Sequence, residues 1–291
     1  MQNVLIVTDS CAHFPNPQVL QQLPITVVPN RITIAGKTYR EGVDLHTEDA
    51  FRLLAHQAYA PALHEPTVAD YLAVYSRLGR EAAGIISIHA SRELLPSWHN
   101  ARAAADQMAG QCEIAVIDSQ TISTGQALLV QLAVTYAEQA QTMDDIIREL
   151  RGAVDRIYSV YCVETMSYLL QNNIMAAPHT ILGTMLGVRP LLAIEAGRFK
   201  PMEKARTRIQ VIERLVEFAA EFSDLDDAVI VQNRTSISEQ TRILQDRLAV
   251  EFPGRHFPYM AYGPSLAALI GTDAAGLVVL ESELDRIEDD F

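Results

Sequence analysis

The stretch GIISIHA at residues 84–90, followed by SRELLPSWHNA at 91–101, decides the fold class of this chain. A short apolar run that opens through a polar loop into a helical pattern is typical of a strand–loop–helix unit in a parallel sheet. Helix N-termini offer free N–H groups in such loops, so a ligand contact is expected here. The middle of this loop is nevertheless Leu94-Leu95-Pro96, where binding loops favour Gly, Ser and Thr.

The same alternation of strand and helix patterns extends outward through the first half of the chain. Apolar runs at 4–7 and 114–117 end in Thr8-Asp9-Ser10 and Asp118-Ser119, and an extended run covers 25–34. Helical patterns begin at Thr47 and at Pro66-Thr67, and two long ones cover about 125–141 and 143–156. This order predicts a parallel sheet with helices on both faces.

The second half of the chain has a different pattern. A strand pattern at 157–163 is followed by a helical region at about 165–187 and a hairpin at 190–199. A long helix is expected at about 203–222, and strands near 228–232 and 256–261 flank a helix near 236–250. We therefore predict domains at 1–156 and 157–281, with an acidic tail at 282–291 that is read as solvated.

Composition excludes several classes of function. The chain has 291 residues and a net charge of −13, with only three lysines, which argues against nucleic acid and anionic membranes as partners. No stretch approaches the roughly 20 apolar residues of a membrane span. The stretch MQNVLIVTDS lacks a basic region followed by a long apolar run, so it is not expected to be a signal peptide. Cys11, Cys112 and Cys162 share no metal-ligand spacing. Reduced thiols and a cytoplasmic location are expected.

Motifs for a cofactor or a metal are not found in the sequence. There is no glycine-rich phosphate loop, no HExxH and no GxSxG, and the eight histidines include no pair at i, i+4. We expect no cofactor, no metal and no catalytic residue. Asp9-Ser10 and Asp118-Ser119 at strand ends fit either ligand contact or ordinary turn chemistry.

One segment of the second half is crowded with flexible apolar side chains. Such a cluster forms either plain core or a long apolar cavity for a chain-like ligand. The candidates for an acyl-chain pocket are Met166, Met175, Ile181, Leu182, Met185 and Leu186.

Five stretches in order carry a family resemblance. They are VLIVTDS at 4–10, GKTYREGVDL at 36–45, VIDSQTISTGQALLV at 116–130, YLL at 168–170 and LGTMLGVRPLLAIEAGRFKPMEKARTR at 182–208. The ordered set resembles the DegV family over nearly the whole chain. The resemblance implies an α/β fold with an N-terminal Rossmann-like parallel-sheet domain and a C-terminal α/β (α+β-like) domain with a mixed sheet. It also implies a long-chain fatty acid or related lipid between the domains, carried for a bacterial fatty-acid kinase by a protein with no catalytic group of its own.

The chain departs from the family at the positions that the resemblance assigns to the lipid head group. Leu63, Leu95 and Leu269 stand where the family has Thr, Ser and His. Burying a carboxylate without donors costs several kcal/mol or raises its pKa. We therefore expect that His64, His99 or Arg92 supplies a contact, that the head group is neutral or bulkier, or that the pocket accepts a purely apolar ligand. The family's Gly-Gly-Arg is Asn172-Asn173-Ile174 here, which counts against a kinase partner. The expected head-group region is Asp9, Ser10, Leu63, His64, Ser91, Leu95, Ser97 and Leu269.

Three hypotheses follow from these residues. The leading one is a non-catalytic lipid-binding protein that holds an acyl chain between its two domains. The second is a hydrolase or transferase that uses Asp9, Ser10 and His64 in an interdomain cleft. The third is a scaffold of the same fold that has lost its ligand, with the three leucines closing the pocket mouth.

Overall fold

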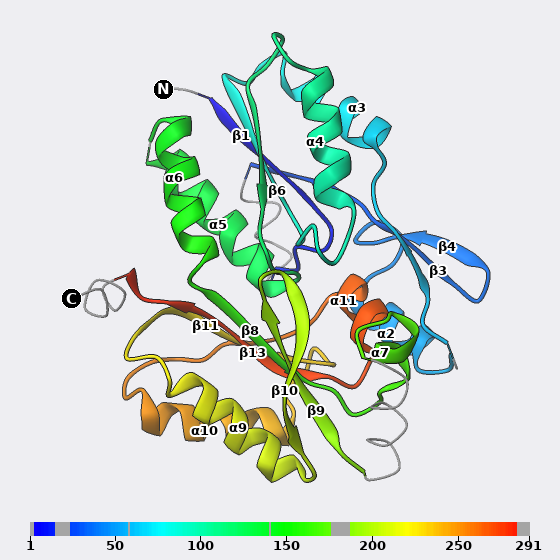
Figure 1. Cartoon of the computed structure of the whole chain (residues 1–291), viewed down its shortest axis with the longest axis vertical. Helices are drawn as coiled ribbons and strands as arrows, with labels where there is room; N and C mark the ends of the chain where they lie inside the picture. Colours follow the sequence, from blue (N-terminus) through cyan, green and yellow to red (C-terminus); the bar gives the residue numbers. More distant parts are fainter. Residues whose placement is uncertain (1–2, 15–23, 58, 140, 176–186, 284–291) are drawn as a thin grey trace. The chain divides into compact units, whose positions relative to one another are not determined.

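The computed structural model describes residues 3–14, 24–57, 59–139, 141–175 and 187–283 (Figure 1). The chain forms two compact units. The first contains Met1–His46, Ala62–Asp155 and Ala196–Arg198, and the second contains Thr47–Pro61, Arg156–Glu195 and Phe199–Phe291. Neither unit is therefore one continuous stretch of sequence.

A four-stranded parallel sheet with the order β2-β1-β6-β7 forms the centre of the first unit. Its strands in that order are Ile25–Val28, Val4–Asp9, Gly84–His89 and Ile114–Asp118. Every residue of β6 is buried, as expected for a central parallel strand with both faces covered. The predicted parallel sheet is confirmed. Its register pairs Thr8 with Ile88 and His89 with Asp118, so the carboxyl ends of three strands meet at one edge.

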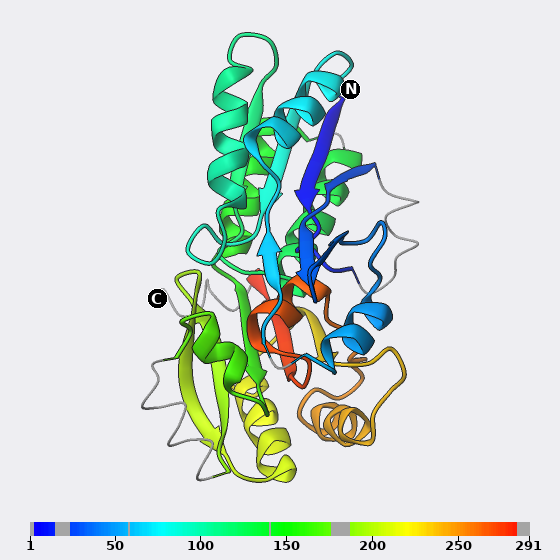
Figure 2. The same ribbon diagram turned by 90° about the vertical axis from the view of Figure 1, so that its right-hand side faces the viewer.

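Helices cover both faces of this sheet (Figures 1 and 2). On one face, α3 (Val68–Leu78) and α4 (Ser97–Gln107) pack their buried tyrosines and alanines against apolar side chains of β1, β2 and β6. On the other, α5 (Thr124–Glu138) contacts β1 and β6, and α6 (Met143–Val154) contacts β6. The predicted start of α3 is correct: Thr67 accepts from the N–H of Asp70 in a capping box.

The first unit also contains a small antiparallel sheet with the order β4-β3-β5, made of Lys37–Arg40, Arg31–Ile34 and Ala62–His64. The extended run predicted at 25–34 is in fact two strands in two sheets. Pro29 has no N–H to donate to a ladder. The next N–H, of Asn30, donates to Ser10 Oγ at 2.8 Å instead of to a strand. The chain therefore leaves the parallel sheet at this point.

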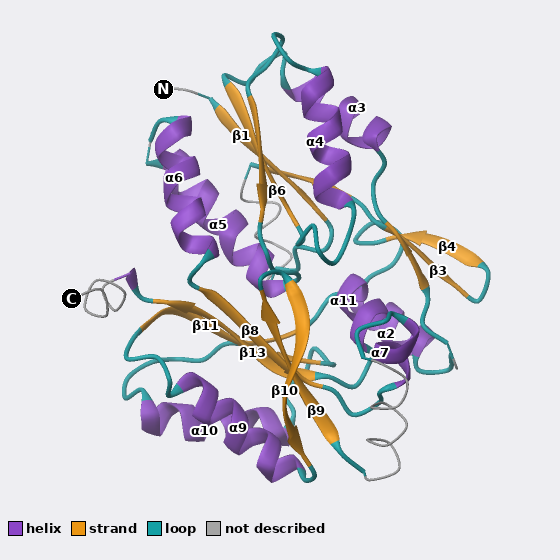
Figure 3. Cartoon of the chain, viewed as in Figure 1, coloured by secondary structure: helices purple, strands orange, loops and turns teal. Residues whose placement is uncertain are grey.

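A six-stranded mixed sheet with the order β10-β9-β8-β13-β11-β12 forms the centre of the second unit (Figure 3). Its strands in that order are Arg198–Ala205, Arg189–Glu195, Ile157–Cys162, Ala275–Glu281, Leu225–Gln232 and Tyr259–Ala261. Strand β8 is antiparallel to β9 and β13, whereas β11 and β12 are parallel. The mixed sheet is as predicted, although β13 was not recognised in the sequence.

Helices α9 (Arg208–Ala219) and α10 (Glu239–Glu251) cover one face of the mixed sheet. The long helix expected from about 203 begins later, because β10 continues to Ala205 and a capping box at Thr207 starts α9. Elsewhere in this unit, α11 (Pro264–Ile270) contacts α2 (Thr47–Leu54) and α7 (Ser167–Gln171). In the parts of the chain that the structure describes, no helix has the length and apolar character needed to cross a membrane.

Candidate functional site

Polar side chains gather at the carboxyl edge of the parallel sheet in the first unit. Strand β1 ends at Asp9, β6 at His89 and β7 at Asp118. Asp9 and His89 are both 0% exposed. Because open α/β sheets bind their ligands outside this edge, it is the first candidate for a functional site.

A chain of hydrogen bonds runs through the buried core behind this edge. The Nδ1 atom of His89 lies 2.8 Å from Asp9 Oδ2, and its Nε2 atom lies 2.7 Å from Ser87 Oγ. The hydroxyl of Tyr75 donates to Ser87 Oγ at 2.8 Å. With Asp9 accepting from Nδ1–H, Nε2 is free to accept from Ser87, so every proton in the chain has one acceptor.

Asp9 is held by further donors on its other oxygen. Its Oδ1 accepts from the backbone N–H of Cys11 at 3.0 Å and from Gln126 Nε2 at 3.2 Å. Gln126 belongs to the first turn of α5, so the carboxyl group joins that helix to the ends of β1 and β6. A buried carboxyl group requires such donors, because unpaired burial costs several kcal/mol.

The order Ser87–His89–Asp9 has the connectivity of a hydrolytic triad, but the structure closes it off. In a triad the Ser oxygen must reach a substrate carbonyl. All three side chains are 0% exposed, and Tyr75 already occupies Ser87. Burial raises the pKa of Tyr75, so its phenol stays protonated and remains a donor. The arrangement therefore fixes the strand ends and offers no route to a substrate.

Ser10 belongs to a second cluster beside the first. Its hydroxyl donates to Glu41 Oε2 at 2.7 Å and accepts from the N–H of Asn30 at 2.8 Å. Asn30 Nδ2 donates to the same Glu41 oxygen at 3.3 Å. Ser10 is 7% exposed, so its hydroxyl is engaged in holding the segment after β2.

The contacts do not bring together Asp9, Ser10 and His64, the three residues of the hydrolase or transferase hypothesis. His64 is exposed at the end of β5, where its backbone lies opposite that of Arg31 in β3. The imidazole that is hydrogen-bonded to Asp9 belongs to His89. Sequence reasoning missed His89, although Ser87 and His89 stand two residues apart in a strand and must share a face.

The carboxyl group next to His64 is a further residue that sequence reasoning missed. Glu65 is half-buried, and its pKa is raised by that burial. The charge of Asp9 raises this pKa further, whereas the charge of His64 lowers it. Glu65 is thus a titratable group near the buried Asp9.

The loop between β6 and α4 is folded around Ser91. The N–H groups of Leu94 and Leu95 both donate to the carbonyl of Ser91 at 3.0 Å, and the N–H of Glu93 donates to Ser91 Oγ at 3.2 Å. Leu95 is only 5% exposed. Its side chain therefore adds to the core, and Ser97 is buried as the first residue of α4.

The hairpin turn Ala196–Arg198, which belongs to the first unit, contacts this loop. Gly197 lies so near Ser91 that a Cβ atom would stand 2.3 Å from Ser91 Oγ, and its φ of +78° is a conformation that glycine adopts readily. Arg198 Nε donates to Glu93 Oε2 at 2.9 Å. The hairpin turn thus holds the Ser91 loop in place.

The remaining predicted site residues lie elsewhere. Leu63 is half-buried on β5, opposite Ile32. Leu269 belongs to α11 in the second unit, and its carbonyl accepts from Asn172 Nδ2 at 2.9 Å. In the same unit Met166 is buried before α7, and Met175 is half-buried after it. The other four acyl-pocket candidates, Ile181, Leu182, Met185 and Leu186, lie outside the described residues.

Comparison with known proteins shows which family this chain belongs to. A family model described as an uncharacterised protein of the DegV family matches residues 3–282. The chain belongs to the DegV family. Protein DegV of Bacillus subtilis is 26% identical over 280 residues, covering 94% of this chain and 98% of that protein. A DegV domain-containing protein of Streptomyces coelicolor is 28% identical, covering 96% and 98%.

Solved structures of DegV proteins show the same fold. A fatty-acid-binding DegV family protein of Thermus thermophilus superimposes with a TM-score of 0.86 at 23% identity, covering 97% of this chain and all of that one. The fatty-acid-binding protein SAG1342 of Streptococcus agalactiae gives 0.87 at 21% identity, with the same coverage. DegV of Bacillus subtilis, also described as a fatty-acid-binding protein, gives 0.83 at 24%.

Proposed function

We propose that this DegV protein binds a fatty acid or a closely related lipid and catalyses no reaction on it. The observation that carries the proposal is membership of the DegV family over residues 3–282, a family in which several solved proteins are described as fatty-acid-binding. Both sheets of that fold are present here. That the acyl chain lies between the two domains stays a prediction of the sequence.

The polar edge of the parallel sheet supports a head-group site in the first unit. Ser91 and Ser97 keep hydroxyl groups there, both of them buried, so a head group would have to enter the interior to meet them; the Asp9–His89 hydrogen bond holds two of the strand ends. Leu63, which is half-buried, and Leu95, which is buried, are apolar where the family resemblance implies hydroxyl groups. We therefore propose a head group that needs fewer hydrogen bonds than a free carboxylate, such as a protonated or esterified one.

Burial of the Ser87–His89–Asp9 chain supports a binding role over the hydrolase alternative. General acid–base catalysis requires the catalytic group to come within hydrogen-bond reach of substrate. None of these three side chains is exposed, and Ser10 is held by Glu41. The proposal includes a cytoplasmic location, since Cys11, Cys112 and Cys162 form no disulfide. The proposal includes no kinase partner, because Asn172-Asn173-Ile174 replaces the Gly-Gly-Arg that the family resemblance implies.

Mass spectrometry of the purified protein tests the function directly. Native spectra measure the mass of the protein with its ligand, and solvent extraction of the denatured protein identifies the ligand. We expect one lipid per chain. A protein that arrives empty and takes up nothing from a panel of fatty acids and their esters would favour the scaffold hypothesis instead.

A reversion series tests the role of the leucines. Leu95→Ser and Leu63→Thr restore donors, and each should tighten binding of oleate by about tenfold or more, since a hydrogen bond to a charged group contributes about 1.5–3 kcal/mol. Leu53→Thr, a half-buried leucine outside the proposed head-group region, is the matched control. Unchanged oleate affinity in both reversion variants would place the head group elsewhere.

A further inference from the structure

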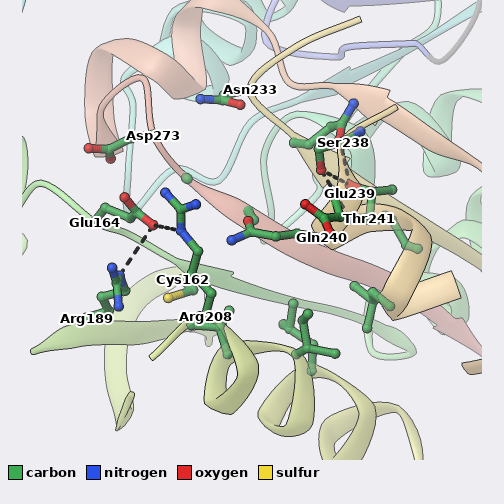
Figure 4. A pocket seen from close by; sticks show the side chains of 18 of the residues that line it. Cys162, Glu164, Arg189, Arg208, Asn233, Ser238, Glu239, Gln240, Thr241 and Asp273 are labelled. Atoms are coloured by element: carbon green, nitrogen blue, oxygen red, sulfur yellow. Dashed lines mark hydrogen bonds and ion pairs between the residues drawn. The ribbon is translucent and has the colours of Figure 1, made fainter. Parts of the chain in front are cut away.

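A cavity of about 270 Å³ opens in the second unit, on the face of the mixed sheet that α9 and α10 cover (Figure 4). It lies where β8 and β11 end and where β9, β13 and both helices begin. Pockets for drug-sized ligands start at about 300 Å³. This cavity therefore suits a ligand smaller than a long-chain fatty acid.

The floor of the cavity has a buried apolar part, beside the buried polar side chains of Gln232 and Thr241. Leu215 of α9, Ile230 of β11 and Cys162 of β8 line it, and each is at most 2% exposed. Burial raises the pKa of the Cys162 thiol to about 12, so the sulfur is uncharged at neutral pH and acts as an apolar surface. A ligand that fills this floor must carry an apolar group.

The mouth of the cavity already holds a carboxylate between two guanidinium groups. Figure 4 shows Glu164 paired with both Arg189 and Arg208. Its Oε1 lies 3.3 Å from Arg189 Nε and 3.5 Å from Arg208 Nε. The side chains of Glu164, Arg208 and Arg189 are 37%, 65% and 24% exposed. Nη1 of Arg189 also donates to the carbonyl of Arg206 at 2.7 Å. Exposed ion pairs of this kind contribute about 0–1 kcal/mol. An incoming carboxylate that replaces Glu164 therefore exchanges one such ion pair for another.

Two helix starts add partial positive charge to the arginines. Arg208 is the first residue of α9 and Glu239 the first of α10, and N–H groups of a first turn have no partner within their helix. The lining holds Arg189, Arg208 and Arg234 against Glu164, Glu239 and Asp273. Asp273 is already occupied by the N–H and the hydroxyl of Thr165.

We propose that this cavity binds a small amphipathic carboxylate whose head group replaces Glu164 between Arg189 and Arg208 and whose short chain covers the apolar part of the floor. The site goes beyond the fatty-acid function. The cavity lies on one face of the mixed sheet. Cys162 of β8 lines the cavity, whereas the preceding residue, Tyr161, points to the opposite face because side chains alternate along a strand. Met166 and Met175, the two predicted acyl-chain residues that the structure describes, do not line it.

Calorimetric titration of the whole protein with hexanoate tests the site. We expect saturable binding in the millimolar range or tighter, and weaker binding of acetate by roughly fourfold for each methylene group no longer buried. Arg208→Gln should weaken hexanoate about tenfold or more. Glu164→Gln should tighten it, because the competing carboxylate is gone. Arg214→Gln is the matched control, since Arg214 lies on the same helix, pairs with Glu203 and Glu217, and does not line the cavity.

Palmitate and hexyl phosphate separate this site from other sources of binding. Hexanoate that still binds after saturation with palmitate supports a separate site, whereas loss of hexanoate under palmitate would overturn the proposal. Hexyl phosphate that binds more tightly than hexanoate would overturn the choice of a carboxylate. Absence of saturable hexanoate binding, or equal affinities of the wild type, Arg208→Gln and Arg189→Gln, would also overturn it.

Discussion

Replacing His89 by leucine should destabilise the first unit far more than a typical surface change. Leucine removes both ring nitrogens from a site that is 0% exposed. Asp9 Oδ2 then loses the donor at 2.8 Å, and the Ser87 hydroxyl loses the acceptor at 2.7 Å. A buried polar group left unpaired costs about 1–3 kcal/mol, so the two losses lower the free energy of unfolding by about 2–6 kcal/mol. That is a large fraction of the about 5–15 kcal/mol typical of a domain.

Urea unfolding followed by tryptophan fluorescence measures this loss in the right unit. Trp98 is the only tryptophan of the chain and belongs to the first unit. Tyr75→Phe is the matched control: it deletes one hydroxyl at the far end of the same hydrogen-bond chain and should cost only about 1 kcal/mol. A loss in His89→Leu no greater than in Tyr75→Phe would refute the reasoning. A double-mutant cycle with Asp9→Ala should show coupling of about 1 kcal/mol or more between Asp9 and His89.

Three further predictions concern other sites. Gly197→Ala should destabilise the Ser91 loop by about 1–3 kcal/mol, because the new Cβ would meet Ser91 Oγ and φ is +78°; an unchanged urea midpoint by tryptophan fluorescence would contradict this. The Arg31 guanidinium lowers the pKa of Asp70 to about 2. A carboxyl group whose pKa is lower in the folded state adds stability above its unfolded pKa, and that stability is lost as pH falls from about 4 towards 2. Asp70→Asn should flatten the pH dependence of the urea midpoint there by at most about 1 kcal/mol, since the pair is partly exposed. The Cys162 thiol, with its pKa raised to about 12, should react with a small thiol reagent far more slowly than a free thiol does, because only the thiolate reacts; labelling of the native protein at the rate of a free thiol would contradict the raised pKa.

Periodicity was sufficient to locate most strands and helices of this chain. Apolar runs such as 4–7 and 84–90 can be buried on both faces only in a parallel sheet, and Thr67 marks the start of α3 by local hydrogen bonding. Local patterns failed where two elements meet without a break in hydrophobicity. Pro29 divides β2 from β3, and β10 extends into the segment assigned to α9.

At the candidate site, too, the sequence predicted what is local and missed the contacts between distant residues. The sequence alone identified Asp9 and Ser10 as polar ends of a strand, since that follows from order along the chain. It could not pair Asp9 with His89, because the two are 80 residues apart and meet only through the register of β1 and β6.

Sequence order by itself therefore determined the family, the parallel and mixed sheets, and the residues at strand ends, because these follow from local periodicity and motif order. The tertiary structure alone decided which of those residues are hydrogen-bonded to each other. It also decided which arginines share Glu164 at the cavity of the second unit. Hydrogen bonds and ion pairs act over about 3–4 Å, and only folding brings residues distant in sequence within that range.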